Sequence, residues 1–187
     1  MRAALCGAAT VLVLAMTACG TEPSTPMAPP PDVLGSVTTT RTSTLDIAAI
    51  AADAVGEAEL TAILEEAGVE SAVERWFTAG PAIRRLQVRI VRFADARGAE
   101  TYIRWLESHV EDVIGDADAV SGSETLAATS LFFHEADPCC PKETNVALAA
   151  WRDGTEVVRI LVAGPGVDVA STTEYVDDVR GWHSTAR

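Results

Sequence analysis

The chain of 187 residues carries 14 Lys+Arg against 27 Asp+Glu, a net charge of −13, with 48% hydrophobic and 5% aromatic residues. This length suits one domain with appendages. The acidic balance argues against nucleic-acid binding, which needs a basic surface facing the phosphates. The one long apolar run lies at the N-terminus, which excludes a multispan membrane protein.

The first residues have the layout of a secretory signal peptide. Arg2 precedes an apolar stretch from Ala3 to Met16, shorter than the roughly 20 residues of a membrane-spanning helix. The stretch ends in Met16-Thr17-Ala18-Cys19, which resembles the lipobox of bacterial lipoproteins, with methionine where the family usually has leucine. The resemblance implies that residues 1–18 are removed and that the Cys19 thiol carries a diacylglyceryl group with acyl chains such as palmitate. An ordinary secreted protein and an uncleaved anchor are the alternatives.

Residues 19–45 are expected to form a disordered tether that begins at the lipidated cysteine. Five of the nine prolines and a Ser/Thr run lie between residues 20 and 45, a composition too poor in apolar side chains to bury a core. As a coil such a tether would span roughly 30 Å, and as extended polyproline II up to about 80 Å. The globular domain is predicted to occupy residues 46–187.

The first half of this domain is predicted to hold two strands between two helices. Residues 46–54 are ambiguous between helix and strand. The predicted elements that follow are a helix over Glu57–Ala67, strands over Ser71–Thr78 and Ile83–Phe93, and a long helix capped by Asp95 that runs to about Val113. The second strand alternates most plainly, with apolar residues at positions 86, 88 and 90 and polar residues at 85, 87 and 89.

The second half follows an acidic connector at residues 116–124. Its predicted elements are strands over Ala128–His134, Asn145–Arg152 and Thr155–Ala163, and a helix capped by Asp168 that runs to about Arg180. Asp153-Gly154 between two apolar runs is a strong hairpin signal. The sequence therefore predicts a single α+β domain with an antiparallel sheet of about five strands and helices packed on one face. The other face would meet solvent or form a concave binding surface.

Two adjacent cysteines are the most unusual feature of the domain. Cys6 leaves with the signal peptide and Cys19 is lipidated, so only Cys139 and Cys140 remain to form an intramolecular disulfide. Adjacent Cα atoms lie about 3.8 Å apart, below the usual disulfide range of roughly 4.4–6.8 Å, so this vicinal disulfide would be strained. One interpretation is a bond that rigidifies a loop, and another is a redox switch or ligand platform. A third is a pair of reduced thiols that binds a soft metal with His134 or forms a disulfide with another chain.

No catalytic or metal-binding pattern accompanies these cysteines. The sequence contains no G-x-S-x-G elbow and no H-E-x-x-H motif, so neither a catalytic residue, a metal ligand set nor a cofactor is predicted. His109 is expected on the buried face of a helix. Trp151 is interpreted as a core residue, with a ligand groove shared with Phe132 and Phe133 as the alternative.

The lipobox, the Pro/Thr-rich tether and the compact acidic domain together resemble the small extracytoplasmic lipoproteins of GC-rich actinobacterial type. The resemblance implies a position at the cell membrane, lipid-anchored on the extracytoplasmic face, without an assignable activity. The leading hypothesis is a non-enzymatic binding or accessory module for an unknown envelope protein or small ligand, with no nucleic-acid partner. The alternatives are a redox-active or soft-metal-handling lipoprotein using Cys139 and Cys140, and a carrier of an apolar envelope molecule.

Overall fold

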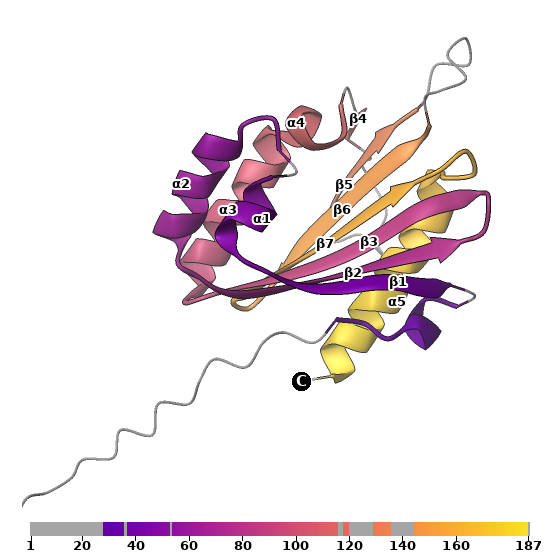
Figure 1. Cartoon of the computed structure of the whole chain (residues 1–187), viewed down its shortest axis with the longest axis horizontal. Coiled ribbons are helices and arrows are strands. Elements are labelled where there is room, and N and C mark those ends of the chain that lie inside the picture. The colour runs from indigo at the N-terminus through magenta and orange to yellow at the C-terminus, as the bar shows by residue number, and fades with distance from the viewer. Residues whose placement is uncertain are drawn as a thin grey trace, which may run out of the picture.

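A seven-stranded antiparallel sheet forms the centre of the molecule, in the strand order β1-β2-β3-β7-β6-β5-β4. The structure, a computed structural model, describes residues 28–35, 37–52, 54–115, 118–119, 129–135 and 144–186. The strands, visible in Figure 1, are β1 (Thr38–Leu45), β2 (Val69–Ala79), β3 (Ile83–Phe93), β4 (Asp118–Ala119), β5 (Thr129–His134), β6 (Val146–Asp153) and β7 (Glu156–Ala163).

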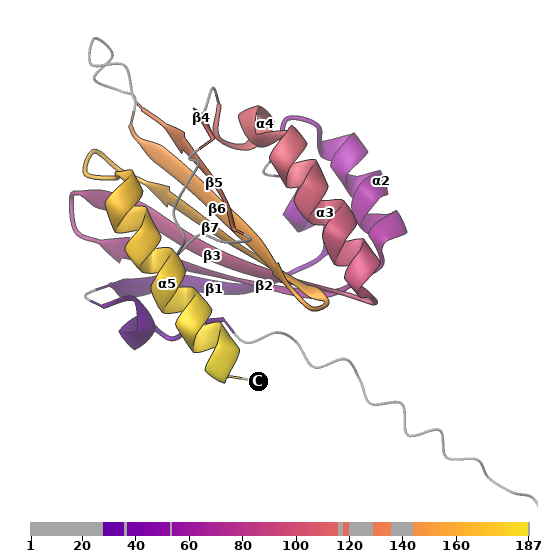
Figure 2. The same cartoon turned by 180° about the vertical axis from the view of Figure 1, so that it is seen from behind.

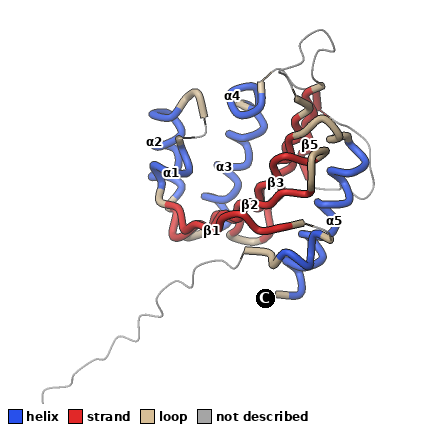
Figure 3. Tube along the Cα trace, turned by 45° about the vertical axis from the view of Figure 1, so that its right-hand side comes forward, coloured by secondary structure: helices blue, strands red, loops and turns tan. Residues whose placement is uncertain are grey.

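Helices lie on both faces of the sheet, so the prediction that they pack on one face is wrong. One face is covered by α1 (Ile47–Ala51), α2 (Glu57–Ala67), α3 (Ala96–Ser108) and α4 (Val110–Ile114), and the other by α5 (Val169–Thr185) and the 3-10 helix η1 (Pro31–Leu34). Figure 3 shows the sheet between these two layers, and Figure 2 shows α5 crossing it diagonally. The central strands β3 and β7 are buried along almost their whole length, and strands with two apolar faces need cover on both.

Two core layers result from this arrangement. The layer beneath α5 joins the sheet to that helix and to η1, through Leu34, Leu86, Val88, Ile90, Val158, Ile160, Val176 and Val179. The opposite layer joins the sheet to α1, α2 and α3, through Ile50, Leu60, Leu64, Val91, Phe93, Tyr102, Leu106 and Val157. Successive residues of β3 therefore belong to opposite core layers, because successive side chains of a strand point to opposite faces of the sheet.

The five predicted strands are confirmed as β2, β3, β5, β6 and β7, and the sheet gains two more. β4 has two residues and pairs with β5. β1 pairs with β2 along its length and forms one edge of the sheet. Its sequence, TTTRTSTL, is rich in β-branched threonine but has no apolar alternation, so the partner strand rather than an amphipathic pattern brings it into the sheet.

The predicted tether therefore ends earlier than residue 45. Residues 28–35, the N-terminal strap, lie against the sheet face that α5 covers, where Ala28 is 5% and Leu34 is 2% exposed. The Arg75 Nη1 donates a hydrogen bond of 2.6 Å to the Pro29 carbonyl oxygen. The strap and β1 belong to the folded domain because these contacts bury apolar and polar groups that a free tether would leave in water.

Replacing Leu34 with alanine tests whether the strap is part of the fold. We expect Leu34→Ala to lower the free energy of unfolding by about 2 kcal/mol, because a fully buried leucine loses its apolar contacts. Urea denaturation of the full chain measures this change. The exposed neighbour Asp32 supplies the control, since Asp32→Ala should change stability by less than about 0.5 kcal/mol. If Leu34→Ala were as stable as the wild type, residues 28–35 would belong to the tether and not to the folded domain.

The helices differ from the prediction at three places. The ambiguous segment after the cap Asp46 is the short helix α1. The long helix predicted to run to about Val113 is divided into α3 and α4 at His109, which has φ −126° and ψ 30° and lies outside the helical region. The last helix continues to Thr185, five residues beyond the predicted end at Arg180.

Candidate functional site

Charged side chains lie on the α1–α4 face of the sheet, next to its apolar core. The strand register places Ala72, Val91 and Val157 in one row across β2, β3 and β7, and all three belong to the core beneath α1–α3. The next row on the same face contains Glu74, Arg89 and Arg159, and the row after it contains Arg41, Trp76 and Gln87. We call these six residues and Arg85 the arginine cluster.

Most of the arginine cluster is buried, although it is polar. Gln87 is 0%, Glu74 2%, Arg89 2% and Arg159 3% exposed. Burying a charge in this way is unfavourable unless other groups pair with it and donate hydrogen bonds to it. The contacts around Glu74 meet this requirement.

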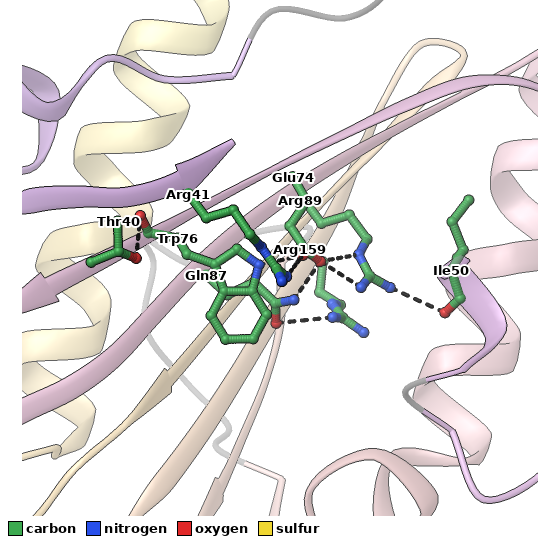
Figure 4. Close-up of polar contacts among 8 residues, drawn as sticks. All are labelled: Thr40, Arg41, Ile50, Glu74, Trp76, Gln87, Arg89 and Arg159. Atoms are coloured by element: carbon green, nitrogen blue, oxygen red, sulfur yellow. Dashed lines mark hydrogen bonds and ion pairs between the residues drawn. The ribbon is translucent and has the colours of Figure 1, made fainter. Parts of the chain in front are cut away.

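The Glu74 carboxylate is the acceptor at the centre of the cluster (Figure 4). Its Oε2 accepts from the Arg89 Nε at 2.8 Å, from the Arg89 Nη2 and from the Gln87 Nε2. Its Oε1 accepts from the Trp76 Nε1 and, at 3.2 Å, from the Arg41 Nη2. Both carboxylate oxygens are therefore occupied by donors.

These contacts keep Glu74 ionised. Burial raises the pKa of the carboxyl, but the Arg89 charge and the hydrogen bonds from Arg89, Trp76 and Gln87 outweigh burial, so the pKa of Glu74 lies below its ordinary value of 4.5. An ionised carboxylate with both oxygens occupied is poorly suited to act as a general base. Its chemistry in this structure is to hold the surrounding donors in place.

The two innermost arginines connect the cluster to its surroundings. Arg89 Nη1 donates to the Ile50 carbonyl oxygen of α1 at 3.1 Å, which ties the helical layer to the sheet. Arg159 Nη2 donates to the Gln87 Oε1 at 3.1 Å. Arg89 and Arg159 lie directly opposite each other in the register of β3 and β7, an arrangement of like charges that is unfavourable without a nearby anion.

The outer side of the cluster reaches solvent. Its rim consists of Arg41, Trp76 and Arg85, from the three neighbouring strands β1, β2 and β3. The guanidinium carbons of Arg41 and Arg85 lie 4.7 and 4.2 Å from the centre of the Trp76 ring, within cation–π range. The Arg41 side chain is 59% exposed, whereas Trp76 and Arg85 are half-buried. Positive charge and an aromatic ring are therefore presented together beside the helical layer.

The cysteines singled out from the sequence lie outside the described residues. This applies to the lipidation residue Cys19 and to Cys139 and Cys140, so the lipid anchor, the disulfide and the soft-metal alternative stay predictions. His134 ends β5 opposite Val146 of β6. In the part of the chain that the structure describes, no group of three or more His, Cys, Asp and Glu side chains is placed to hold a metal ion.

Trp151, His109 and His183 have structural roles. Trp151 is 3% exposed in the core beneath α5, and Arg180 of α5 lies over its ring at 5.3 Å, so the core interpretation is confirmed and the groove is not. His109 is half-buried rather than buried. It is the C-cap of α3, and its ring stacks on that of Trp105 with 4.8 Å between the ring centres. His183 is 5% exposed and contacts Glu156 at 2.8 Å and Asp153 at 3.2 Å.

The sequence analysis missed the arginine cluster, although one signal for it was present. Positions 85, 87 and 89 form the polar half of the alternation in β3, which normally indicates a face in solvent. The same strand is central in the sheet, and helices cover both faces of that sheet. Two arginines and a glutamine on such a strand need a buried acceptor, and Glu74 on the preceding strand is the matching residue.

Comparison with known proteins gives one informative likeness. No family model and no curated protein matches the sequence. Among solved structures, the chain is similar to the extracellular domain of PknH from Mycobacterium tuberculosis, with a TM-score of 0.55 and 10% sequence identity over 82% of this chain and 89% of that one. The likeness is one of fold. It shows that this α+β arrangement exists as an experimentally observed domain, and it transfers no residue role to the present chain.

Proposed function

We propose that this protein is a lipid-anchored binding module at the outer face of the cell membrane, and that the arginine cluster is its ligand-binding surface. The module has no catalytic activity of its own in this proposal. It is held at the membrane by acyl chains on Cys19 and presents its domain to a small envelope ligand or partner.

The observation that carries the proposal is the buried charge network with an exposed rim. A buried ion pair is weak evidence of stabilisation, because apolar residues of similar volume often stabilise a fold equally well. Buried charged groups whose pKa values are perturbed are also enriched at functional sites. Glu74 and Arg89 hold Trp76 and Gln87 in fixed positions, which is the support that a binding surface requires.

Three further observations support the location. The N-terminal residues resemble a lipoprotein signal that ends at Cys19. The structurally similar domain of PknH is an extracellular domain. Among the helices that the structure describes, none has the length and apolar character needed to cross a bilayer.

The proposal is tested first by asking whether the anchor is at Cys19. In an actinobacterial host, we expect the wild-type full chain to sediment with membranes and the Cys19→Ala variant to be released, because the acidic body is not attracted to anionic lipids. Cys6→Ala is the matched control and should remain with the membrane. Retention of Cys19→Ala on the membrane would contradict the proposed anchor.

The same full chain then tests the binding surface. We expect a fraction of small molecules extracted from the cell envelope to raise the melting temperature, because a ligand that binds only the folded state stabilises it. Arg41→Ala should abolish this rise. Arg104→Ala, at a side chain of α3 that is 73% exposed and bonded to Glu100, should leave it intact. A rise that survives Arg41→Ala would place the binding surface elsewhere.

A further inference from the structure

The outer edge of β1 presents backbone groups that no other strand pairs with in the part of the chain that the structure describes. β1 ends the strand order on one side of the sheet, and Figures 1 and 3 show it at the rim. Among the described residues, the backbone of 38–45 bonds only to β2. An edge strand carries a row of N–H and C=O groups directed away from the sheet, which is a template for a further strand.

Only the second half of β1 is a regular template. The register with β2 shifts between Thr39 and Arg41, and the side chain of the intervening Thr40 donates to the Trp76 carbonyl oxygen at 3.2 Å. Such a bulge disrupts the hydrogen-bond ladder and protects an edge from pairing. From Arg41 to Leu45 each residue has one partner on β2 in an unbroken register, so this half is suited to receive another strand.

The side chains of the regular half define what that strand must carry. Arg41, Ser43 and Leu45 lie on the face of the sheet that α1–α4 cover. Leu45 is half-buried and packs against the core of that face. Arg41 is the one charged residue of β1, and its side chain is 59% exposed. It donates to Glu74 through Nη2 at 3.2 Å, which leaves further N–H groups of the guanidinium fork accessible.

We propose that the edge segment Arg41–Leu45 accepts an extended strand of a partner protein, with a carboxylate side chain opposite Arg41 and an apolar side chain opposite Leu45. This inference rests on the proposed binding function and names the kind of partner. Main-chain hydrogen bonds supply the affinity of an added strand, and its side chains supply the specificity. Since every second residue of a strand shares a face, the partner's acidic and apolar residues must be four positions apart.

Charge favours a partner protein over a second copy of this chain. β1 contains no acidic residue that a second copy could place opposite Arg41. Two copies, each with a net charge of −13, also repel one another. A carboxylate from a partner strand would instead continue the row that contains Gln87, Trp76 and Arg41. Opposite charges on facing residues of neighbouring strands stabilise the pair, and a guanidinium–carboxylate bond is among the stronger hydrogen bonds.

Hydrogen–deuterium exchange of the full chain tests the proposal with a synthetic peptide, acetyl-VTTTETTTV-amide. Its central glutamate has a valine four positions away on both sides, so it fits β1 in either strand direction. We expect the peptide to slow amide exchange in the fragment that contains residues 38–45, because new backbone hydrogen bonds protect those amides. Exchange in α3 should not change. A copy of the peptide with every backbone N–H methylated should give no protection.

A second measurement isolates the side-chain pair. We expect Arg41→Ala to weaken binding of the glutamate peptide by about tenfold or more. Replacing the glutamate of the peptide with glutamine should have the same effect on the wild type. Arg41→Ala should then bind the glutamine peptide nearly as the wild type does, because the two changes remove the same contact. Arg104→Ala, at an exposed side chain of α3, should bind the glutamate peptide as the wild type does.

Three results would overturn the proposal. The first is no protection of residues 38–45 at about 1 mM peptide, where even a Kd of about 1 mM gives half occupancy. The second is an Arg41→Ala variant that loses affinity equally for the glutamate and glutamine peptides, since Arg41 would then not meet the carboxylate. The third is protection of residues 38–45 that grows with protein concentration in the absence of peptide, because a second copy would then occupy the edge.

Failure of this inference is distinguishable from failure of the proposed function. If an envelope fraction raises the melting temperature and Arg41→Ala abolishes the rise, while the fraction and the peptide both leave exchange of residues 38–45 unchanged, the binding surface is correct and the added strand is wrong. If the peptide protects residues 38–45 and the pair of changes behaves as expected, the edge of β1 is part of the binding surface.

Discussion

Glu74→Gln is expected to lower the free energy of unfolding by about 3–5 kcal/mol, because it leaves the buried Arg89 guanidinium without its counter-charge. Glutamine preserves the shape of the side chain, so the loss reports the charge rather than a cavity. Equilibrium denaturation in urea measures the change. Glu100→Gln is the matched control, since Glu100 pairs with Arg104 and Arg152 at the surface and should change stability by less than about 1 kcal/mol.

The pH dependence of the same variant gives an independent check. The folded-state pKa of Glu74 is lowered below 4.5, so its contribution to stability is fully present above pH 4.5. This contribution is lost as the pH falls from 4.5 through the lowered pKa. The difference in stability between the wild type and Glu74→Gln should therefore be constant near neutrality and shrink in acid. A difference that stays constant down to pH 2 would mean that folding does not lower the pKa of Glu74.

Gly98→Ala is expected to destabilise the domain by about 3 kcal/mol, because a Cβ at this position would lie 2.0 Å from the Ala67 carbonyl oxygen. Gly98 belongs to the first turn of α3, where its backbone N–H donates to the cap Asp95 at 2.8 Å. The close approach allows the end of α2 to pack against the start of α3. An added methyl group must move backbone atoms, which side-chain rearrangement cannot absorb. Thermal and urea unfolding both measure the loss.

The control for Gly98→Ala is a glycine with the opposite expectation. Gly181 lies within α5, and a Cβ there would meet nothing within 4 Å. Gly181→Ala should raise the free energy of unfolding by about 0.5–1 kcal/mol, because alanine loses less backbone entropy in a helix. If Gly98→Ala raised stability as Gly181→Ala is expected to do, helix propensity rather than the contact with Ala67 would govern Gly98.

The secondary structure was predictable where local patterns and packing agree. The Asp153-Gly154 turn placed β6 and β7, and β3 was predicted with the bounds that the structure gives it. β1 was not predictable, because a threonine-rich segment after five prolines has the composition of a linker and forms a strand only beside β2. The position of α5 could not be predicted, because the prediction requires knowing that both faces of the sheet are apolar. The sequence of one strand does not show this.

The candidate site could not be predicted from the sequence, and the reason is physical. Glu74, Arg89 and Arg159 come from three strands, and the register alone makes them neighbours. In the sequence, each of the three is a charged residue within a predicted strand. Cys19, Cys139 and Cys140 were predicted as site residues because each belongs to a local sequence pattern. Cys19 ends a lipobox, and the other two are an adjacent cysteine pair. A site assembled across a sheet has no such local pattern.

Under the proposed lipidation of Cys19, the N-terminal strap limits how far the domain can lie from the membrane. With the chain fixed to the fold from Ala28 onward, the reach from a lipidated Cys19 is limited to nine residue steps, roughly 30 Å when fully extended. A 26-residue tether would have allowed more than twice that height. The arginine cluster would then meet ligands only within a thin layer above the bilayer, where diffusion is effectively two-dimensional. In the proposed anchored state, a ligand of the cluster would have to enter that layer, and lengthening the segment between Cys19 and Ala28 should increase the distance from the bilayer that the cluster can reach.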